Sequence, residues 1–210
     1  NSVDLWDVTD KAQPVRLSST TYSDVNYTHS GWPSADQRHI FVHDELEEIR
    51  RGLLTQIYTM NLDSLINPFI VASYQGPDTT TDHNGYTKGN LLYVSHYRRG
   101  LAIFDASTPS QLREIGHFDT FLSPSANTAG FDGAWGVYPF LPSGTILVSD
   151  INNGLFILRE RLAALWPEAT LLPVARNGLE ALAAIREDEP DAAFLDIRMP
   201  GLTGLDVAAA

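Results

Sequence analysis

The sequence predicts a mixed fold in two parts: repeated short antiparallel strands, then a segment that alternates helices with strands. Two observations support this prediction. The composition changes abruptly near residue 159, and the sequence before that point repeats with a period of a little over 50 residues. We therefore expect one domain over residues 1–158 and a second over residues 159–210.

The two parts have different compositions. Residues 159–210 contain 12 alanines in 52 positions, whereas residues 1–158 contain 8 alanines. All six histidines and 19 of the 21 aromatic residues lie in the first part. Sequence rich in aromatic residues, Gly and Thr favours strands and turns, and sequence rich in Ala, Leu, Glu and Arg favours helices. Natural domain boundaries usually fall in exposed polar linkers, and the join at 154–162 is not of that kind.

Composition also excludes several classes of function. The formal net charge is −12, and nucleic-acid-binding surfaces are basic, so we expect no nucleic-acid partner. The chain has no cysteine, which excludes disulfides and thiolate metal sites. Its apolar runs are far shorter than the roughly 20 residues of a membrane helix, and no signal peptide is visible. Because the chain starts at Asn1 in a strand-like pattern, we interpret it as a fragment.

The first part contains two alternating patterns. One begins beside a glycine and an aromatic residue and runs into an apolar strand, at 28–44, 82–96 and 131–150. The other, at 3–10, 56–63 and 100–107, ends in a proline turn and a further short strand; 154–158 begins a fourth copy. Each unit thus holds about four short strands separated by turns, which is typical of a propeller blade. We predict an incomplete antiparallel β-propeller of about three four-stranded blades. A β-sandwich with regularly spaced strands is the alternative.

A family resemblance covers nearly all of the first part. The pattern Leu101-x-Ile103-Phe104-Asp105-x-Ser107-x-Pro109 resembles the LVIVD repeat of bacterial surface proteins. The stretches 30–38, 81–86, 130–140 and 142–150 resemble the proteins called choice-of-anchor B. The resemblance implies an exported or cell-surface propeller. Since single-ring propellers have four to eight blades, we expect this part to be truncated at both ends.

Five residues of the first part are candidates for a binding site in the propeller channel. They occupy matching repeat positions, with a spacing of 54 residues between His29 and His83 and of 52 between His83 and Trp135; the other two are Asp82 and Asp132. Such side chains could bind a metal or a polar ligand. The alternative is that they satisfy backbone groups in turns. No catalytic triad order or paired-carboxylate spacing is visible, so we expect no enzyme. The acidic run 43–45 lacks the spaced oxygen ligands of a calcium loop.

The second part reads as an α/β segment. Residues 162–166 and 179–186 have apolar positions at helical spacing, and 170–175 reads as a strand. The continuous apolar run 192–197 is typical of a buried parallel strand, and 205–210 begins another helix. This alternation predicts a flavodoxin-like layer fold, in which ligands bind at the carboxyl ends of the strands. Asp196 lies at such an end.

The residues around Asp196 resemble a known family. The segment 191–204 is similar to the phosphoacceptor segment of response-regulator receiver domains, and 176–182 to their second-helix entry, with a LytTR-type regulator as the subtype. The resemblance covers about half a receiver. It implies that Asp196 accepts a phosphoryl group from a sensor histidine kinase. It also implies Mg²⁺ as cofactor, bound by Asp196, the backbone carbonyl of Arg198 and an acidic pair. That pair is missing, because residues 157–160 read Ile-Leu-Arg-Glu.

Two functions are therefore expected. The first is a two-component phosphorelay receiver fragment, fused to a propeller fragment and impaired in activity. The alternative is an extracellular or cell-surface propeller that binds an unknown ligand. The receiver implies a cytoplasmic location and the propeller an exported one, with no membrane segment between them. We therefore expect a fragment or a chimeric reading frame.

Overall fold

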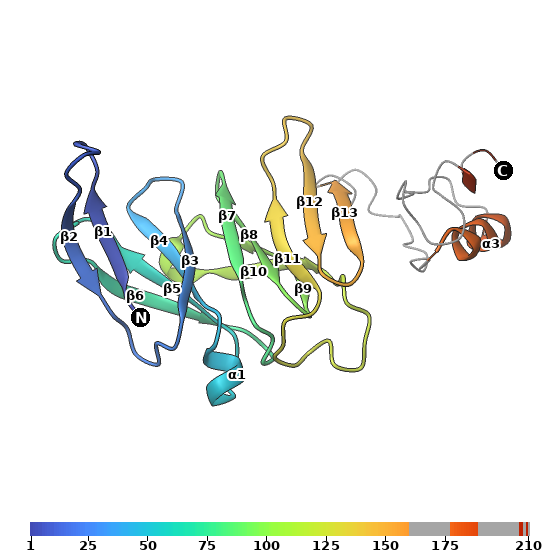
Figure 1. The fold of residues 1–210 in the computed structure, drawn as a ribbon, viewed down its shortest axis with the longest axis horizontal. Helices are drawn as coiled ribbons and strands as arrows, with labels where there is room; N and C mark the ends of the chain where they lie inside the picture. Colours follow the sequence, from blue (N-terminus) through green and yellow to red (C-terminus); the bar gives the residue numbers. More distant parts are fainter. Residues whose placement is uncertain (160–176, 189–205, 208, 210) are drawn as a thin grey trace. The chain divides into compact units, whose positions relative to one another are not determined.

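The computed structural model describes residues 1–159, 177–188, 206–207 and 209. The chain divides into two compact units, Asn1–Leu158 and Arg159–Ala210, and each is described separately. The first unit consists of antiparallel sheets whose strands follow one another in sequence (Figure 1).

The first unit contains four sheets. A two-stranded sheet joins β1 (Val3–Asp7) to β2 (Val15–Thr20). A four-stranded sheet comprises β3 (Thr28–Pro33), β4 (His39–Asp44), β5 (Gln56–Asn61) and β6 (Phe69–Gln75). The next comprises β7 (Asn84–Lys88), β8 (Leu91–His96), β9 (Gly100–Asp105) and β10 (Arg113–Phe118). The last comprises β11 (Ala134–Tyr138), β12 (Thr145–Asp150) and β13 (Gly154–Arg159). The short helix α1 (Glu47–Arg51) connects β4 to β5, and a 3₁₀ turn (Pro109–Gln111) precedes β10.

The order of the strands agrees with the repeat found in the sequence. Every segment of the two repeating patterns contains one or two of the strands in this part of the chain. The number of strands in each sheet differs from the prediction of about three four-stranded blades. Within residues 1–159, two sheets have four strands, one has three and one has two, and none of them closes on itself.

The sheets stack face to face, so that neighbouring residues of one strand point into different cores. On β4, Phe41 enters the core shared with the β7–β10 sheet, whereas Val42 packs with Tyr22 and Tyr58 on the opposite face. On β8, Leu92 and Val94 enter the first of these cores. Burial on both faces explains why these strands are continuous apolar runs rather than alternating ones.

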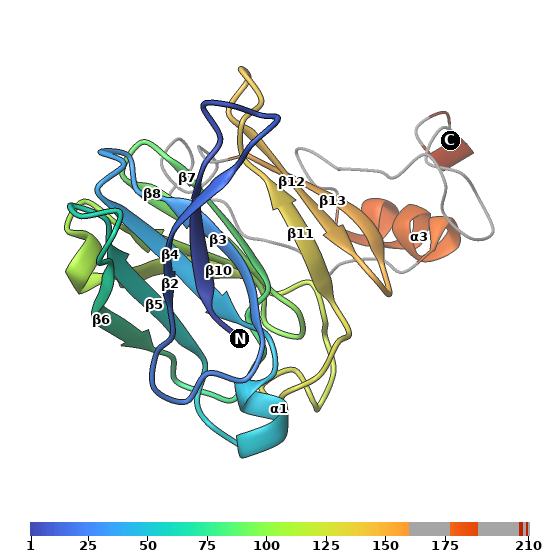
Figure 2. The same ribbon diagram turned by 60° about the vertical axis from the view of Figure 1, so that its left-hand side comes forward.

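The first strands of three successive sheets lie side by side. β7 contacts β3 on one side and β11 on the other (Figures 1 and 2). Two side-chain hydrogen bonds cross from β3 to the β7 segment. The Ser30 hydroxyl donates to the carbonyl of His83 at 2.5 Å, and the Thr87 hydroxyl donates to the carbonyl of Pro33 at 2.6 Å. The three strands therefore bring residues about 50 positions apart in the sequence to one place.

The second unit has one described helix of more than two residues, α3 (Gly178–Asp188), where the sequence predicted an amphipathic helix. Its N-cap is Asn177, whose side-chain oxygen accepts a hydrogen bond from the backbone N–H of Glu180 at 2.9 Å. The predicted strand 192–197, and with it Asp196 and Arg198, lies outside the described residues. Across the described ranges, no helix has the length and apolar character needed to span a membrane.

Candidate functional site

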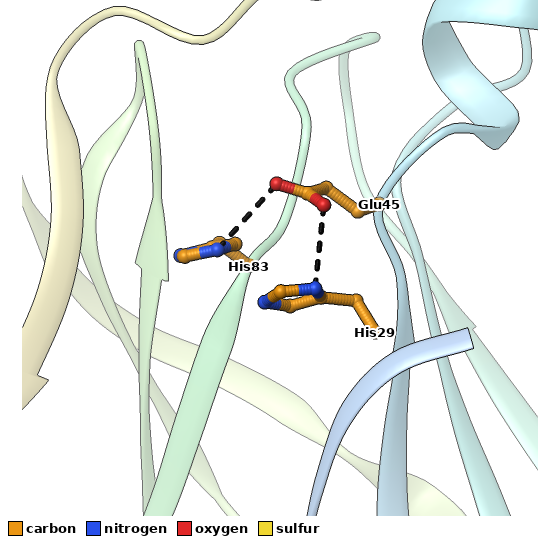
Figure 3. A group of neighbouring side chains, drawn as sticks. All are labelled: His29, Glu45 and His83. Carbon is orange, nitrogen blue, oxygen red and sulfur yellow. Dashed lines mark ion pairs between the residues drawn. The ribbon is translucent and has the colours of Figure 1, made fainter. Parts of the chain in front are cut away.

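Three side chains from the first two four-stranded sheets converge at the ends of their strands. His29 lies on β3, Glu45 directly follows β4, and His83 directly precedes β7. The Glu45 carboxylate faces both rings: one oxygen lies 3.3 Å from Nδ1 of His29, and the other lies 3.5 Å from Nε2 of His83 (Figure 3). We call these residues the His–Glu cluster.

The local backbone explains why His29 and Glu45 meet. In the β3–β4 pair, Thr28 lies opposite Asp44 and Ser30 lies opposite His43, so the register shifts at His29. A β-bulge of this kind adds a residue to one strand and redirects its side chain. Since Asp44 ends β4, the next residue, Glu45, lies beside the bulge. His83, which directly precedes the adjacent β7, completes the group, and its ring stacks on that of His29 with centroids 4.3 Å apart.

The β11–β13 sheet fixes the position of His83. Its side chain is almost fully buried, and its Nδ1 lies 2.5 Å from the carbonyl oxygen of Trp135 on β11. The Trp135 ring packs on the imidazole with centroids 4.7 Å apart. The amide of Asn84 lies 2.7 Å from the same Nδ1 and donates to the same carbonyl at 3.2 Å. Burial lowers the pKa of His83, which favours the neutral imidazole.

Tyr97 positions the carboxylate. Its hydroxyl donates to Oε1 of Glu45 at 2.5 Å, and burial raises the pKa of Tyr97, so that it remains a donor. Tyr97 follows β8 with a left-handed φ of 33°. Its carbonyl accepts a hydrogen bond from the backbone N–H of Ala134 at 2.8 Å, which ties the second four-stranded sheet to β11.

A second group of buried polar side chains lies on the same segments. His43 and Asp82 are both fully buried and pair through Nδ1 and a carboxylate oxygen. Burial lowers the pKa of His43 to about 3. Burial and the charge of Asp44 raise the pKa of Asp82 well above its usual range. The two carboxylate oxygens of Glu48, on α1, are buried without a hydrogen-bond partner.

The structure brings together three of the five residues that the sequence suggested for the channel. The ring of His83 packs against those of both His29 and Trp135. Asp82 instead pairs with His43 in the interior. Asp132 accepts hydrogen bonds from the Arg98 guanidinium at 2.7 and 3.0 Å, in a partly exposed ion pair.

Sequence reasoning missed two members of the site, Glu45 and Tyr97. Glu45 belongs to an acidic run at the end of a predicted strand, and its position opposite a histidine required the bulge in β3. Tyr97 follows the predicted strand 91–96 and carries no repeat signal. Asp44, which was not among the candidates, accepts hydrogen bonds from the N–H groups of Asn26 and Tyr27 at 2.6 and 2.7 Å.

The cluster can bind one ligand through three side chains. One donor atom from each residue can be chosen so that all lie within 4.8 Å of one another. The side chains of His29 and Glu45 are 27% and 13% exposed, whereas that of His83 is 1% exposed, so the cluster opens toward solvent on one side. Imidazole nitrogens with a lone pair and a carboxylate are ligands for a cation or a polar group rather than for an anion.

Comparison with solved structures shows a propeller-type fold. The β-propeller domain of Cps50 (Swd1) from Myceliophteria thermophila aligns with 82% of this chain and 54% of its own, with a TM-score of 0.51 and 15% sequence identity. At this identity the similarity concerns the fold alone.

Comparison with curated sequences shows partial similarity to response regulators. The chain is 49% identical over 51 residues to an uncharacterised response regulatory protein of Vibrio cholerae, and 53% identical over 57 residues to the positive alginate biosynthesis regulatory protein of Pseudomonas aeruginosa. These matches cover 24% and 25% of this chain and only 20% and 23% of the two relatives. It is 34% identical over 67 residues to the polar-differentiation response regulator DivK of Brucella anthropi, about half (52%) of that protein. No family model matches the chain.

Proposed function

We propose that residues 1–158 form a binding module, not an enzyme, and that its ligand is a cation bound at the His–Glu cluster. The observation behind this proposal is the Glu45 carboxylate, which faces one nitrogen of each of two stacked imidazole rings at the junction of the sheets. Asp44 directly precedes Glu45 and adds a second acidic side chain to this region. A low-dielectric, electronegative site attracts cations.

The resemblance of the sequence repeats to LVIVD and choice-of-anchor B proteins supports a surface-protein origin for this module. We propose an exported or cell-surface location for it on that basis alone. The ligands of such a module would come from outside the cell, where divalent cations and organic amines are both available.

A thermal-shift experiment tests the binding function. The purified full-length chain is treated with EDTA, dialysed, and melted with Zn²⁺, Ca²⁺, choline or lysine as separate probes. We expect at least one probe to raise the melting temperature of the wild-type chain and to have less effect on Glu45→Gln, which removes the charge at nearly constant shape. Asp10→Asn, which removes a charge from an exposed turn, is the matched control. If no cation stabilises the wild-type chain, the binding proposal is wrong.

A second function concerns residues 159–210 and rests on the similarity to response regulators. We propose that Asp196 is a phosphoacceptor-type aspartate and that a sensor histidine kinase is the partner of the parent receiver. The segment 191–204 carries this proposal, and the LytTR-type subtype belongs to it.

The Mg²⁺ that the receiver resemblance implies does not fit the residues of this chain. The acidic pair that would bind Mg²⁺ should follow the first strand of the receiver. At that place Ile157 and Leu158 belong to β13, which pairs with β12 in the third main sheet. Apolar side chains in a propeller strand cannot supply carboxylate ligands to a hard cation. We therefore propose that phosphotransfer to Asp196 is weak or absent.

Incubation with acetyl phosphate and Mg²⁺, followed by intact-mass analysis, measures this directly. We expect less than stoichiometric phosphorylation, and Asp196→Asn provides the blank. Stoichiometric labelling lost in the Asp196→Asn variant would contradict the impaired-receiver proposal. We further propose that the chain is a chimeric reading frame that joins the two units. A contiguous DNA read across codons 150–170 would contradict this proposal.

A further inference from the structure

We infer that the His–Glu cluster binds a divalent first-row transition-metal ion of the zinc class, with His29, Glu45 and His83 as its protein ligands. This inference rests on the proposed cation-binding function and specifies its ligand. It depends on three observations: the donor spacing, the hydrogen bond at the far side of His83, and the kinds of donor atoms.

The spacing of the donors fits a metal between them. Zinc lies about 2.0–2.2 Å from imidazole nitrogen or carboxylate oxygen, so two tetrahedral ligands are roughly 3.4 Å apart. Oε2 of Glu45 lies 3.3 Å from Nδ1 of His29 and Oε1 lies 3.5 Å from Nε2 of His83, so a shared ion would contact both carboxylate oxygens. These separations are long for hydrogen bonds between the same groups, which are ordinarily about 2.7–2.9 Å when charged.

The hydrogen bond on the far side of His83 prepares its other nitrogen as a ligand. The carbonyl oxygen of Trp135 can only accept, so the 2.5 Å contact selects the tautomer with the proton on Nδ1 of His83, although the donor nitrogen of the Asn84 amide also lies 2.7 Å from that atom. In the neutral ring Nε2 then carries a lone pair. This nitrogen is buried without a hydrogen-bond partner and points toward Glu45 (Figure 3). A lone pair that faces a carboxylate is repelled unless a proton or a metal cation lies between them.

The surrounding residues have the arrangement found around protein metal sites. Metal-binding histidines usually donate their second N–H to a backbone carbonyl or carboxylate, and metal-binding carboxylates accept further hydrogen bonds. Here His83 donates to Trp135, and Glu45 accepts from the Tyr97 hydroxyl at 2.5 Å. Both outer residues are fixed by the neighbouring sheets, so the ligands are positioned before an ion arrives.

The donor types select among metals. Calcium and magnesium prefer oxygen ligands, whereas two of the three donors here are imidazole nitrogens. Two histidines and one carboxylate form a common ligand set for zinc and for other late first-row ions. Three protein ligands leave a fourth position, and it would face the side on which His29 and Glu45 are exposed. That position can take water or a small anion.

The test uses the full-length chain, stripped with EDTA and titrated with Zn²⁺ by isothermal calorimetry. We expect one high-affinity site per chain. Co²⁺ provides an independent readout, because a four-coordinate ion bound to imidazole nitrogen gives intense visible d–d bands that the six-coordinate aqueous ion lacks.

His29→Gln is the informative variant, because His29 is partly exposed and the metal-free protein should keep its melting temperature. We expect a loss of at least ~100-fold in Zn²⁺ affinity, since even outer partners of metal ligands contribute about 10–100-fold. His117→Gln, which removes an exposed histidine on β10, should bind as the wild type does. A stable His29→Gln variant with wild-type affinity would overturn the assignment, and so would an absence of tight Zn²⁺ binding to the wild-type chain. If choline or lysine still stabilises that chain, the cation-binding module survives and only its metal is wrong.

Discussion

Replacing Glu48 by glutamine should stabilise the protein at alkaline pH and have little effect at acidic pH. The Glu48 side chain on α1 is 2% exposed, and neither carboxylate oxygen has a hydrogen-bond partner. Burial, and next the charge of Asp82, raise the pKa of Glu48 to about 10, from 4.5. The folded protein therefore keeps this proton over a pH range in which the unfolded chain has lost it.

The size of the effect follows from proton linkage. Below about pH 4.5 both states are protonated, and the group has no effect on stability. Between pH 4.5 and 10 the folded state binds more protons than the unfolded state, so stability falls as the pH rises. At pH 8 the ideal difference is roughly 5 kcal/mol, at 1.36 kcal/mol per pH unit. Relaxation and water entry reduce such penalties, and we expect about 2–3 kcal/mol.

Urea denaturation followed by tryptophan fluorescence measures this difference. The free energies of unfolding of the wild type and Glu48→Gln are compared at pH 5 and pH 8, with Asp10→Asn as a control for the loss of one exposed charge. The variant should be within about 1 kcal/mol of the wild type at pH 5 and more stable at pH 8. An equal difference at both values would show that Glu48 is ionised in the folded protein.

Three further predictions concern packing, backbone and site. Phe104→Ala removes a fully buried ring from the core between the two four-stranded sheets, and should cost about 3–5 kcal/mol in urea denaturation. Gly133→Ala should destabilise by more than about 1 kcal/mol in the same assay. The reason is that Gly133 has a φ of +87° and an added Cβ would overlap the Tyr97 carbonyl. Tyr97→Phe should weaken Zn²⁺ binding about 10–100-fold by calorimetry, through loss of the hydrogen bond to Glu45; an unchanged affinity would exclude Tyr97 from the site.

The strands of the first unit could be predicted because their pattern is local. The run Leu91–His96 begins with four apolar residues, which include the aromatic Tyr93 and the β-branched Val94, and glycines occur on either side of it. The spacing of about 53 residues also put His29, His83 and Trp135 at matching repeat positions, and the structure brings these three residues together. Repetition thus identified residues from different sheets that come together, but it also included Asp82 and Asp132, which lie apart from them.

The rest of the site depends on features that no repeat contains. The register shift at His29 directs its ring to Glu45, and a bulge of this kind depends on the pairing of two strands rather than on one. The helix α1 interrupts the repeat after β4 and buries Glu47 and Glu48, which an acidic sequence would place in solvent. The repeat also does not show that Asp82 lies apart from the site. Asp82 pairs with His43, and this is a contact between two sheets.

The contact between His83 and Trp135 has a consequence for how the sheets stay assembled. Each sheet packs mainly on its immediate neighbours. As in repeat proteins, one sheet can therefore unfold while the others stay folded. The imidazole of His83 contacts side chains or backbone from all three successive sheets. If the β11–β13 sheet detached, Nδ1 would lose the carbonyl of Trp135, and the Asn84 amide would be its remaining neighbour. The tautomer of His83 therefore reports whether the β11–β13 sheet is docked. The nitrogen chemical shifts of its imidazole ring would show the docking at a single residue.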